Sequence, residues 1–166
     1  SNLSTSIVFN RFCNSSILCD ERQSRGGAIS MCGIVGLIGG RKGTPELIER
    51  LIDPLTHRGP DDRGVWTDPQ SKVAFGHRRL AFIDLSPQGH QPMTSADGRW
   101  VITYNGEVYN HRQLRSDLEK EQLAPLGGWR GHSDTETLLQ AIAAWVLDGA
   151  LPRATSMFAF GLWERV

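Results

Sequence analysis

The sequence predicts an α+β fold built from packed layers of helices and strands. Several segments combine a helix-start signal with an apolar stripe, and several short apolar runs have the length and residue types of buried strands. Two helices on one sheet face cannot cover several fully apolar strands, so a second layer is required. At 166 residues and 39% hydrophobic content, the chain fits a single domain with one core.

The first helix is expected to follow Thr44, with Pro45 at its first position, and to end near Pro54. Its spacing of apolar residues gives the helix one apolar stripe. That stripe consists of Leu47, Ile48, Leu51, Ile52 and Leu55.

Two later helices begin with residues typical of a capping box. In that motif a polar side chain before the helix bonds a backbone N–H of the first turn, and a side chain three places later bonds back. Asn110 with Gln113, and Ser133 with Glu136, have this spacing. Each helix then has its apolar residues on one side, which predicts packing on another element. These residues are Leu114 and Leu118 in one helix, and Leu138, Leu139, Ile142 and Trp145 in the other.

Strand-like runs lie before and between these helices. They cover residues 32–38, residues 73–76 leading into 80–83, residues 100–104 and residues 157–163. Residues 1–30 differ, because they are rich in Ser and Asn and have no sustained period of 2 or 3.6. We therefore expect an unstructured N-terminal extension over residues 1–30, followed by one domain over residues 31–166.

The charge balance argues against nucleic acid and membranes as partners. Eighteen basic residues match eighteen acidic ones, and no apolar stretch approaches the roughly 20 residues that cross a bilayer. We expect a cytoplasmic protein that acts on a small molecule. Cys13, Cys19 and Cys32 are odd in number and lack metal-ligand spacing, so neither a disulfide framework nor a metal site is indicated.

Cys32 has two interpretations. A cysteine in an apolar strand is usually buried and inert. Cys32, however, directly follows Met31, so cleavage between them would place a thiol and an α-amine on one residue. Because such an amine titrates at about 7.7 to 8.0, it can accept the thiol proton near neutral pH. Cys32 is therefore a candidate nucleophile with its own base.

Six sequence blocks occur in the order found in one enzyme family. They are MCGIVG at 31–36, HRGPDD at 57–62, GHRRLAFID at 76–84, YNGEVYN at 104–110, SDTE at 133–136 and MFAF at 157–160. The chain thus resembles the class-II, N-terminal-cysteine glutamine amidotransferase domain of glutamine-hydrolysing asparagine synthetases. The resemblance implies an N-terminal-nucleophile (Ntn) hydrolase fold, a four-layer αββα sandwich of antiparallel sheets. We expect that sandwich to be incomplete, because the family continues with further strands.

The resemblance assigns roles to six residues besides Cys32. Asn105 and Gly106 match the oxyanion hole, although Asn-Gly alone would indicate a hairpin turn. Arg79 matches the arginine that binds the α-carboxylate of glutamine, although its basic neighbours would also fit a solvated edge. The remaining matches are the backbone of Ile83 for the carboxylate, and Glu107 and Asp134 for the ammonium group. An acid at the start of a helix, as at Asp134, is also explained by the helix dipole.

The implied reaction is hydrolysis of L-glutamine to glutamate and ammonia through a Cys32 thioester. A C-terminal synthetase domain, absent from this chain, would use the ammonia with ATP and Mg²⁺ to make asparagine from aspartate. No cofactor is expected in the chain itself, which lacks a phosphate-binding glycine loop. The expected partners are L-glutamine, that synthetase domain and a second copy in a homodimer. The uncut chain is expected to have little activity, because the Cys32 nitrogen is then an amide.

Two alternatives remain from the sequence. The first is a related class-II enzyme that amidates a sugar or an antibiotic precursor, such as a glucosamine-6-phosphate synthase-like protein. The second is a non-catalytic remnant that acts only as an interaction module. A glutaminase assay separates the second alternative from the enzymes.

Overall fold

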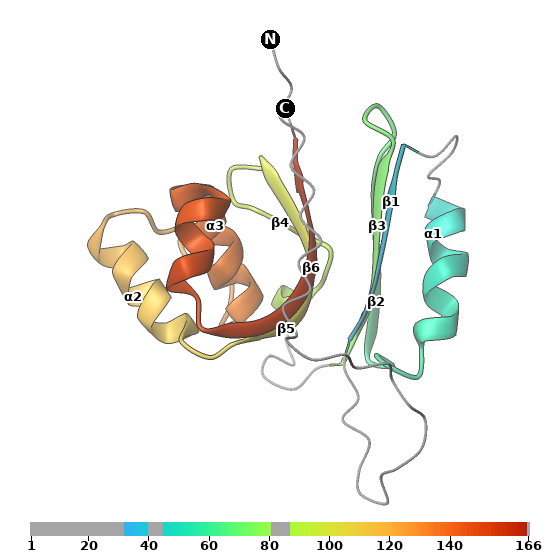
Figure 1. Cartoon of the computed structure of the whole chain (residues 1–166), viewed down its shortest axis with the longest axis horizontal. Helices are drawn as coiled ribbons and strands as arrows, with labels where there is room; N and C mark the ends of the chain where they lie inside the picture. Colours follow the sequence, from blue (N-terminus) through green and yellow to red (C-terminus); the bar gives the residue numbers. More distant parts are fainter. Residues whose placement is uncertain (1–31, 40–44, 81–86, 166) are drawn as a thin grey trace, which may run out of the picture.

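The computed structural model describes residues 32–39, 45–80 and 87–165, and it contains two three-stranded antiparallel sheets (Figure 1). The predicted extension of residues 1–30, together with Met31 and Thr44, lies outside the described residues. The strands are β1 (Gly33–Ile38), β2 (Asp62–Asp68), β3 (Val73–Arg79), β4 (Met93–Thr94), β5 (Trp100–Val108) and β6 (Ser156–Glu164). The helices are α1 (Pro45–Ile52), α2 (His111–Lys120) and α3 (Asp134–Ala150), with 3₁₀ turns at Asp53–Leu55, Pro87–Gly89 and Leu151–Arg153.

The elements form four layers, which confirms the expected α+β sandwich of antiparallel sheets. The first sheet has the strand order β1-β3-β2 and the second has the order β4-β5-β6. Figure 1 shows the two sheets side by side, with α1 outside the first sheet and with α2 and α3 outside the second. The largest buried cluster lies between the second sheet and its two helices, and a smaller one lies between the sheets.

Helix α1 begins at Pro45 and ends before Pro54, as predicted, and two of the five residues of its predicted apolar stripe are fully buried. Ile48 and Ile52 are fully buried against the first sheet, whereas Leu47 is 37% exposed and Leu51 is 40% exposed. One sheet lies under this helix, so a single row of side chains four residues apart makes the contact. The contact with the sheet thus uses part of the predicted apolar stripe.

Helices α2 and α3 follow the predicted capping residues, but neither residue caps its helix through its side chain. Asn110 and Ser133 occupy the N-cap positions without a side-chain capping hydrogen bond. The Asn110 amide instead bonds the backbone of residues 153 and 155, and the Glu136 carboxylate accepts backbone N–H groups from residues 130 and 131. The capping-box interpretation was wrong, because tertiary partners take these side chains.

The predicted strands at 32–38, 73–76, 100–104 and 157–163 correspond to β1, β3, β5 and β6. Strand β3 extends through Arg79, while residues 81–83 of the predicted run lie outside the described residues. Strands β2 and β4 were not predicted. β2 has charged residues and a glycine in a seven-residue strand, so its local pattern is weak, and antiparallel pairing with β3 along its full length forms it.

Candidate active site

Side-chain alternation places Arg79 in the layer between the two sheets. In β3, Val73 and Phe75 pack in the cluster between the sheets, whereas Ala74 packs in the cluster under α1. Because successive side chains of a strand point to opposite faces, His77 and Arg79 also face the second sheet.

The same rule places Asn105 and Glu107 on the inner face of the second sheet. In β5, Ile102 and Tyr104 pack in the cluster under the helices, whereas Val101 packs between the sheets. Residues 105 and 107 continue the inward row. The side chains of Arg79, Asn105 and Glu107 therefore enter the same layer from opposite sheets.

Two hydrogen bonds between the sheets align β3 with β5. His77 Nε2 donates to the Tyr104 carbonyl oxygen at 3.0 Å, and Thr103 Oγ1 donates to the Gly76 carbonyl oxygen at 3.5 Å. Residue 76 is bonded to residue 103 and residue 77 to residue 104, so the residue numbers increase in the same direction along both strands. Strands β3 and β5 therefore run in the same direction. Their C-terminal ends, which carry the candidate residues, therefore lie at the same end of the layer.

Cys32 lies at this end of the layer as well. It directly precedes Gly33, which pairs with Arg78 near the end of β3. Its Sγ accepts the backbone N–H of Leu80 at 3.3 Å, and the side chain is partly buried. In β1, Val35 packs under α1, so alternation directs Cys32 towards the second sheet. The thiol thus contacts the backbone of Leu80, the residue that follows Arg79.

The two adjacent arginines of β3 have different surroundings. Arg78 is 9% exposed, and its guanidinium donates to the Ile52 carbonyl oxygen at 3.2 Å and to Asp53 at 2.9 Å. Arg78 therefore holds the end of α1. Arg79 points to the opposite face, where its guanidinium lies so close to Gly89 that a Cβ there would overlap it. This difference supports Arg79 rather than Arg78 as the candidate substrate ligand.

Asn105 and Gly106 lie inside β5 and not in a turn. They pair with Ala159 and Phe158 of β6, so the hairpin interpretation was wrong. A Cβ at position 106 would overlap the Met157 carbonyl oxygen and lie 2.7 Å from the Phe158 Cα. Close packing of β5 on β6 thus requires glycine at this position.

Asp134 connects the start of α3 to the end of β5. It is 8% exposed, its Oδ2 accepts the Val108 backbone N–H at 2.9 Å, and its Oδ1 accepts the Thr135 N–H at 2.9 Å. Val108 directly follows Glu107, which is exposed on β5. Asp134 therefore lies at the same end of the second sheet as Glu107. Ile83 lies outside the described residues.

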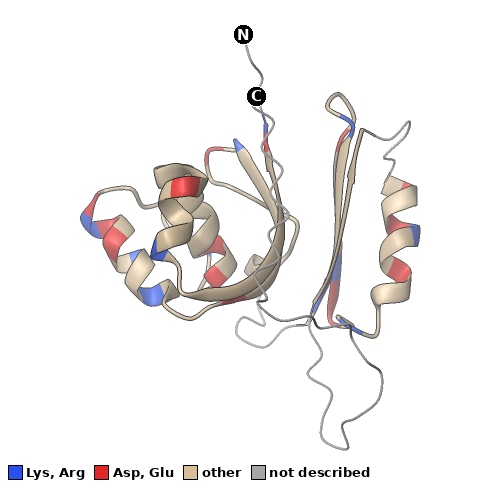
Figure 2. Ribbon diagram, viewed as in Figure 1, with Lys and Arg blue, Asp and Glu red and all other residues tan. Residues whose placement is uncertain are grey.

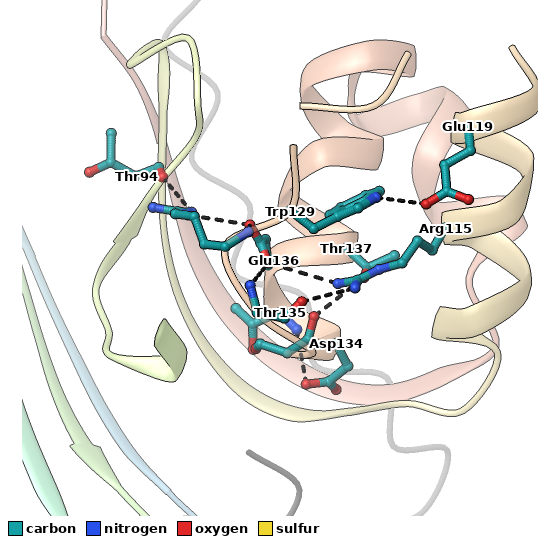
Figure 3. Close-up of polar contacts among 11 residues, drawn as sticks. Thr94, Arg115, Glu119, Trp129, Asp134, Thr135, Glu136 and Thr137 are labelled. Atoms are coloured by element: carbon teal, nitrogen blue, oxygen red, sulfur yellow. Dashed lines mark hydrogen bonds and ion pairs between the residues drawn. The ribbon is translucent and has the colours of Figure 1, made fainter. Parts of the chain in front are cut away.

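The start of α3 is also fixed by a buried carboxylate, Glu136, which is 4% exposed (Figure 3). It accepts the Arg130 backbone N–H at 2.8 Å and the Arg130 Nε–H at 3.3 Å, and the Arg115 guanidinium lies 3.8 Å away. Arg115 also stacks on Trp129, 4.1 Å from the ring centroid. This cluster supports the turn of α3 that carries Asp134, and local sequence spacing did not reveal it.

Comparison with known proteins identifies the family. The sequence model described as "Glutamine amidotransferase domain" matches residues 31–166. The chain belongs to this family. It is 38% identical over 144 residues to "Asparagine synthetase [glutamine-hydrolyzing] 3" of Bacillus subtilis, covering 81% of this chain and 21% of that protein.

Two further relatives show the same partial coverage. "Putative asparagine synthetase [glutamine-hydrolyzing]" of Mycobacterium tuberculosis is 33% identical over 151 residues, with 82% of this chain and 22% of that protein covered. "Amidase chry2" of Gibberella zeae is 34% identical over 146 residues, with 81% and 21% covered. The chain spans about a fifth of the length of these curated relatives.

Within this glutamine amidotransferase domain, His77 is a buried neutral base. Burial lowers its pKa to about 4, although the hydrogen bond to Tyr104 and the charge of Asp62 raise it; Arg79 and His90 lower it further. Its imidazole is therefore uncharged near neutral pH. Among the described residues, none forms a hydrogen bond with its Nδ1.

The outer helices α1 and α2 each carry charged residues of both signs (Figure 2). No helix within the described ranges is long and apolar enough to cross a bilayer. The same ranges contain no group of three or more His, Cys, Asp or Glu residues placed to hold a metal ion.

Proposed function

We propose that this domain hydrolyses L-glutamine for an asparagine synthetase and that Cys32 is its nucleophile. The placement of Cys32, Arg79 and Asn105 at one end of the layer between the sheets supports this most directly. Arg79 belongs to β3, Asn105 belongs to β5 and Cys32 directly precedes β1, so the sequence spacing of these residues does not bring them together.

The first chemical step is attack of the Cys32 Sγ on the side-chain amide carbon of glutamine. After cleavage before Cys32, its α-amine accepts the thiol proton. The amide oxygen becomes negative and receives hydrogen bonds from the Asn105 side-chain amide and the Gly106 backbone N–H. The carbon–nitrogen bond then breaks, the amine returns the proton to the leaving group, and ammonia departs.

The second step is hydrolysis of the γ-glutamyl thioester on Cys32. The α-amine takes a proton from water, and the resulting hydroxide attacks the thioester carbon. The same two donors, Asn105 and Gly106, stabilise the second oxyanion. The carbon–sulfur bond breaks and glutamate leaves, and the protonated amine returns its proton to the sulfur, which restores the thiol and the free amine.

Four contacts would select the amino-acid head group of glutamine. Arg79 and the backbone of Ile83 would bind the α-carboxylate, and a guanidinium is suited to this because it donates two parallel hydrogen bonds. Asp134 and Glu107 would bind the α-ammonium. Each Asp134 oxygen accepts one backbone N–H of the domain and has a further lone pair available for substrate.

The use of the ammonia depends on a synthetase domain beyond the matched region. Most of the cited relatives are named asparagine synthetases, which supports asparagine as the product, made from aspartate with ATP and Mg²⁺. The similar identity to "Amidase chry2" supports a second candidate, transfer of ammonia to another acceptor.

The nucleophile can be tested on one preparation of the full chain. A site for a specific protease is inserted directly before Cys32, so the chain folds whole and is then cut to expose the α-amine. Ammonia and glutamate formed from glutamine are measured before and after cutting. We expect turnover only after cutting, and none in a Cys32→Ala chain treated identically.

Two results would contradict this mechanism. Equal turnover before and after cutting would show that the α-amine is not the base. Turnover by the cut Cys32→Ala chain would remove Cys32 as the nucleophile, and no turnover by any form would favour the non-catalytic alternative.

A further inference from the structure

Within the described residues, β4 does not extend to Tyr104, and two side chains bind the Tyr104 backbone on that edge of β5. Strand β4 consists of two residues and pairs with residues 101 and 102 of β5. Beyond β4, the Tyr104 N–H donates to Gln91 Oε1 at 2.6 Å, and its carbonyl accepts the His77 Nε2–H at 3.0 Å. Two side chains thus replace the hydrogen bonds that a longer β4 would make.

Both bonds lie in the interior. Tyr104 is 2% exposed, His77 is fully buried and Gln91 is 6% exposed. A carbonyl oxygen only accepts, so Nε2 of His77 carries the proton. Water does not compete strongly for hydrogen bonds at such depth, so they restrict the geometry of the groups that they join.

Gln91 extends the connection to the helical layer. Its Nε2 donates to Thr135 Oγ1 at 3.4 Å, and Thr135 directly follows Asp134 at the start of α3. The Tyr104 peptide groups are therefore tied to β3 on one side and to α3 on the other.

Each connected element carries a candidate site residue close to the connection. Arg79 follows His77 by two positions on the same face of β3, and Asn105 directly follows Tyr104. A change in the spacing of β3 and β5 at this point would therefore move Asn105 relative to Arg79 and to Cys32, which directly precedes β1.

We propose that His77 and Gln91 are positioning residues that hold Asn105 at its working distance from Cys32 by binding both polar groups of the Tyr104 backbone. This inference rests on the proposed glutaminase function. Misplacing a catalytic group by about 1 Å can cost about 100-fold in rate, so two buried hydrogen bonds are sufficient to control turnover. We assign no proton transfer to His77, because its Nε2–H is bound to the Tyr104 carbonyl oxygen and its ring is fully buried.

The first test compares two substitutions of His77 in the protease-cut chain. His77→Leu removes the donor, whereas His77→Gln keeps an N–H at a similar reach. We expect His77→Leu to lower kcat about 10-fold or more and His77→Gln to stay within about threefold of the parent, as misplacement of the oxyanion donor predicts. The KM for glutamine should change much less than kcat, because Arg79 and Cys32 stay on the first sheet.

The second test is a double-mutant cycle with Asn105→Ala. If His77 acts through Asn105, His77→Leu should cost less than about threefold in kcat once Asn105 is alanine. Full additivity in an active parent would overturn the inference while leaving the proposed function intact. A parent without glutaminase activity would instead refute the proposed function, and this inference with it.

Gln91→Met provides an independent variant if His77→Leu does not fold. It should show the same loss of kcat and the same lack of additivity with Asn105→Ala. Circular dichroism establishes whether each variant is folded. If neither variant folds, the two side chains are needed for the fold itself, and a separate positioning role is overturned.

Discussion

Acid should destabilise this domain through His77. The pKa of His77 is lowered from 6.5 to about 4, chiefly by burial. The unfolded chain therefore takes up this proton at a higher pH than the folded domain does. Stability from the neutral imidazole is fully present above pH 6.5 and is lost as the pH falls from 6.5 towards 4.

The interval between the pKa of His77 in the unfolded chain and in the folded domain sets the size of this loss of stability. One pH unit corresponds to about 1.4 kcal/mol, so the interval from 6.5 to about 4 amounts to about 3 kcal/mol. Between pH 7 and pH 5 the loss should be about 2 kcal/mol, because part of the titration is then complete. Small domains are stable by roughly 5 to 15 kcal/mol, so this loss is measurable by urea unfolding.

The control is His77→Gln, which keeps a donor for the Tyr104 carbonyl and does not titrate. Tryptophan fluorescence during urea unfolding at pH 7, 6 and 5 gives the free energy of unfolding for both proteins. Asp62 and His90 also act electrostatically on His77, and both remain in the variant. Parallel pH dependences in the two proteins would refute the assignment of a buried neutral His77.

Three further predictions concern the site and its support. Arg79→Lys should raise the KM for glutamine about 10-fold or more, because an ammonium cannot donate the planar pair of hydrogen bonds that a guanidinium donates. The matched control is Arg63→Lys at an exposed arginine, and equal KM values in the two variants would exclude Arg79 from glutamine binding. Asn105→Ala should lower kcat roughly 100-fold or more by loss of an oxyanion donor, whereas a change confined to KM would argue against that role. Glu136→Gln should lower the free energy of unfolding by about 1 to 3 kcal/mol, because Arg115 loses a buried charged partner. An unchanged midpoint of urea unfolding would show that the Glu136 charge does not stabilise the domain.

The local elements of this domain follow largely from its sequence. Helix α1 begins at Pro45, and α2 and α3 follow Asn110 and Ser133, as predicted. These positions are predictable because helix-start signals and apolar periods depend on residues only a few positions apart. The four longest apolar strand runs were also predictable. The expected fold of two antiparallel sheets between helices is confirmed, and the family resemblance that implied it is confirmed by the match over residues 31–166.

The tertiary structure alone decided which partner each polar side chain takes. Arg78 and Arg79 are identical neighbours in sequence, and only the packing of α1 on one face of β3 sends the first to Asp53 and the second into the layer between the sheets. Strand β2 likewise depends on pairing with β3.

The hydrogen bond from His77 to Tyr104 shows the physical reason. The two residues are 27 positions apart, on different sheets, and no period or spacing relates them. Helix and strand periods depend on residues that are close together in the sequence. The sequence by itself therefore determined where the elements lie and which residues have side chains suited to catalysis or substrate binding. Which buried donor meets which acceptor depends on how the layers stack, and that is settled only when the whole chain has folded.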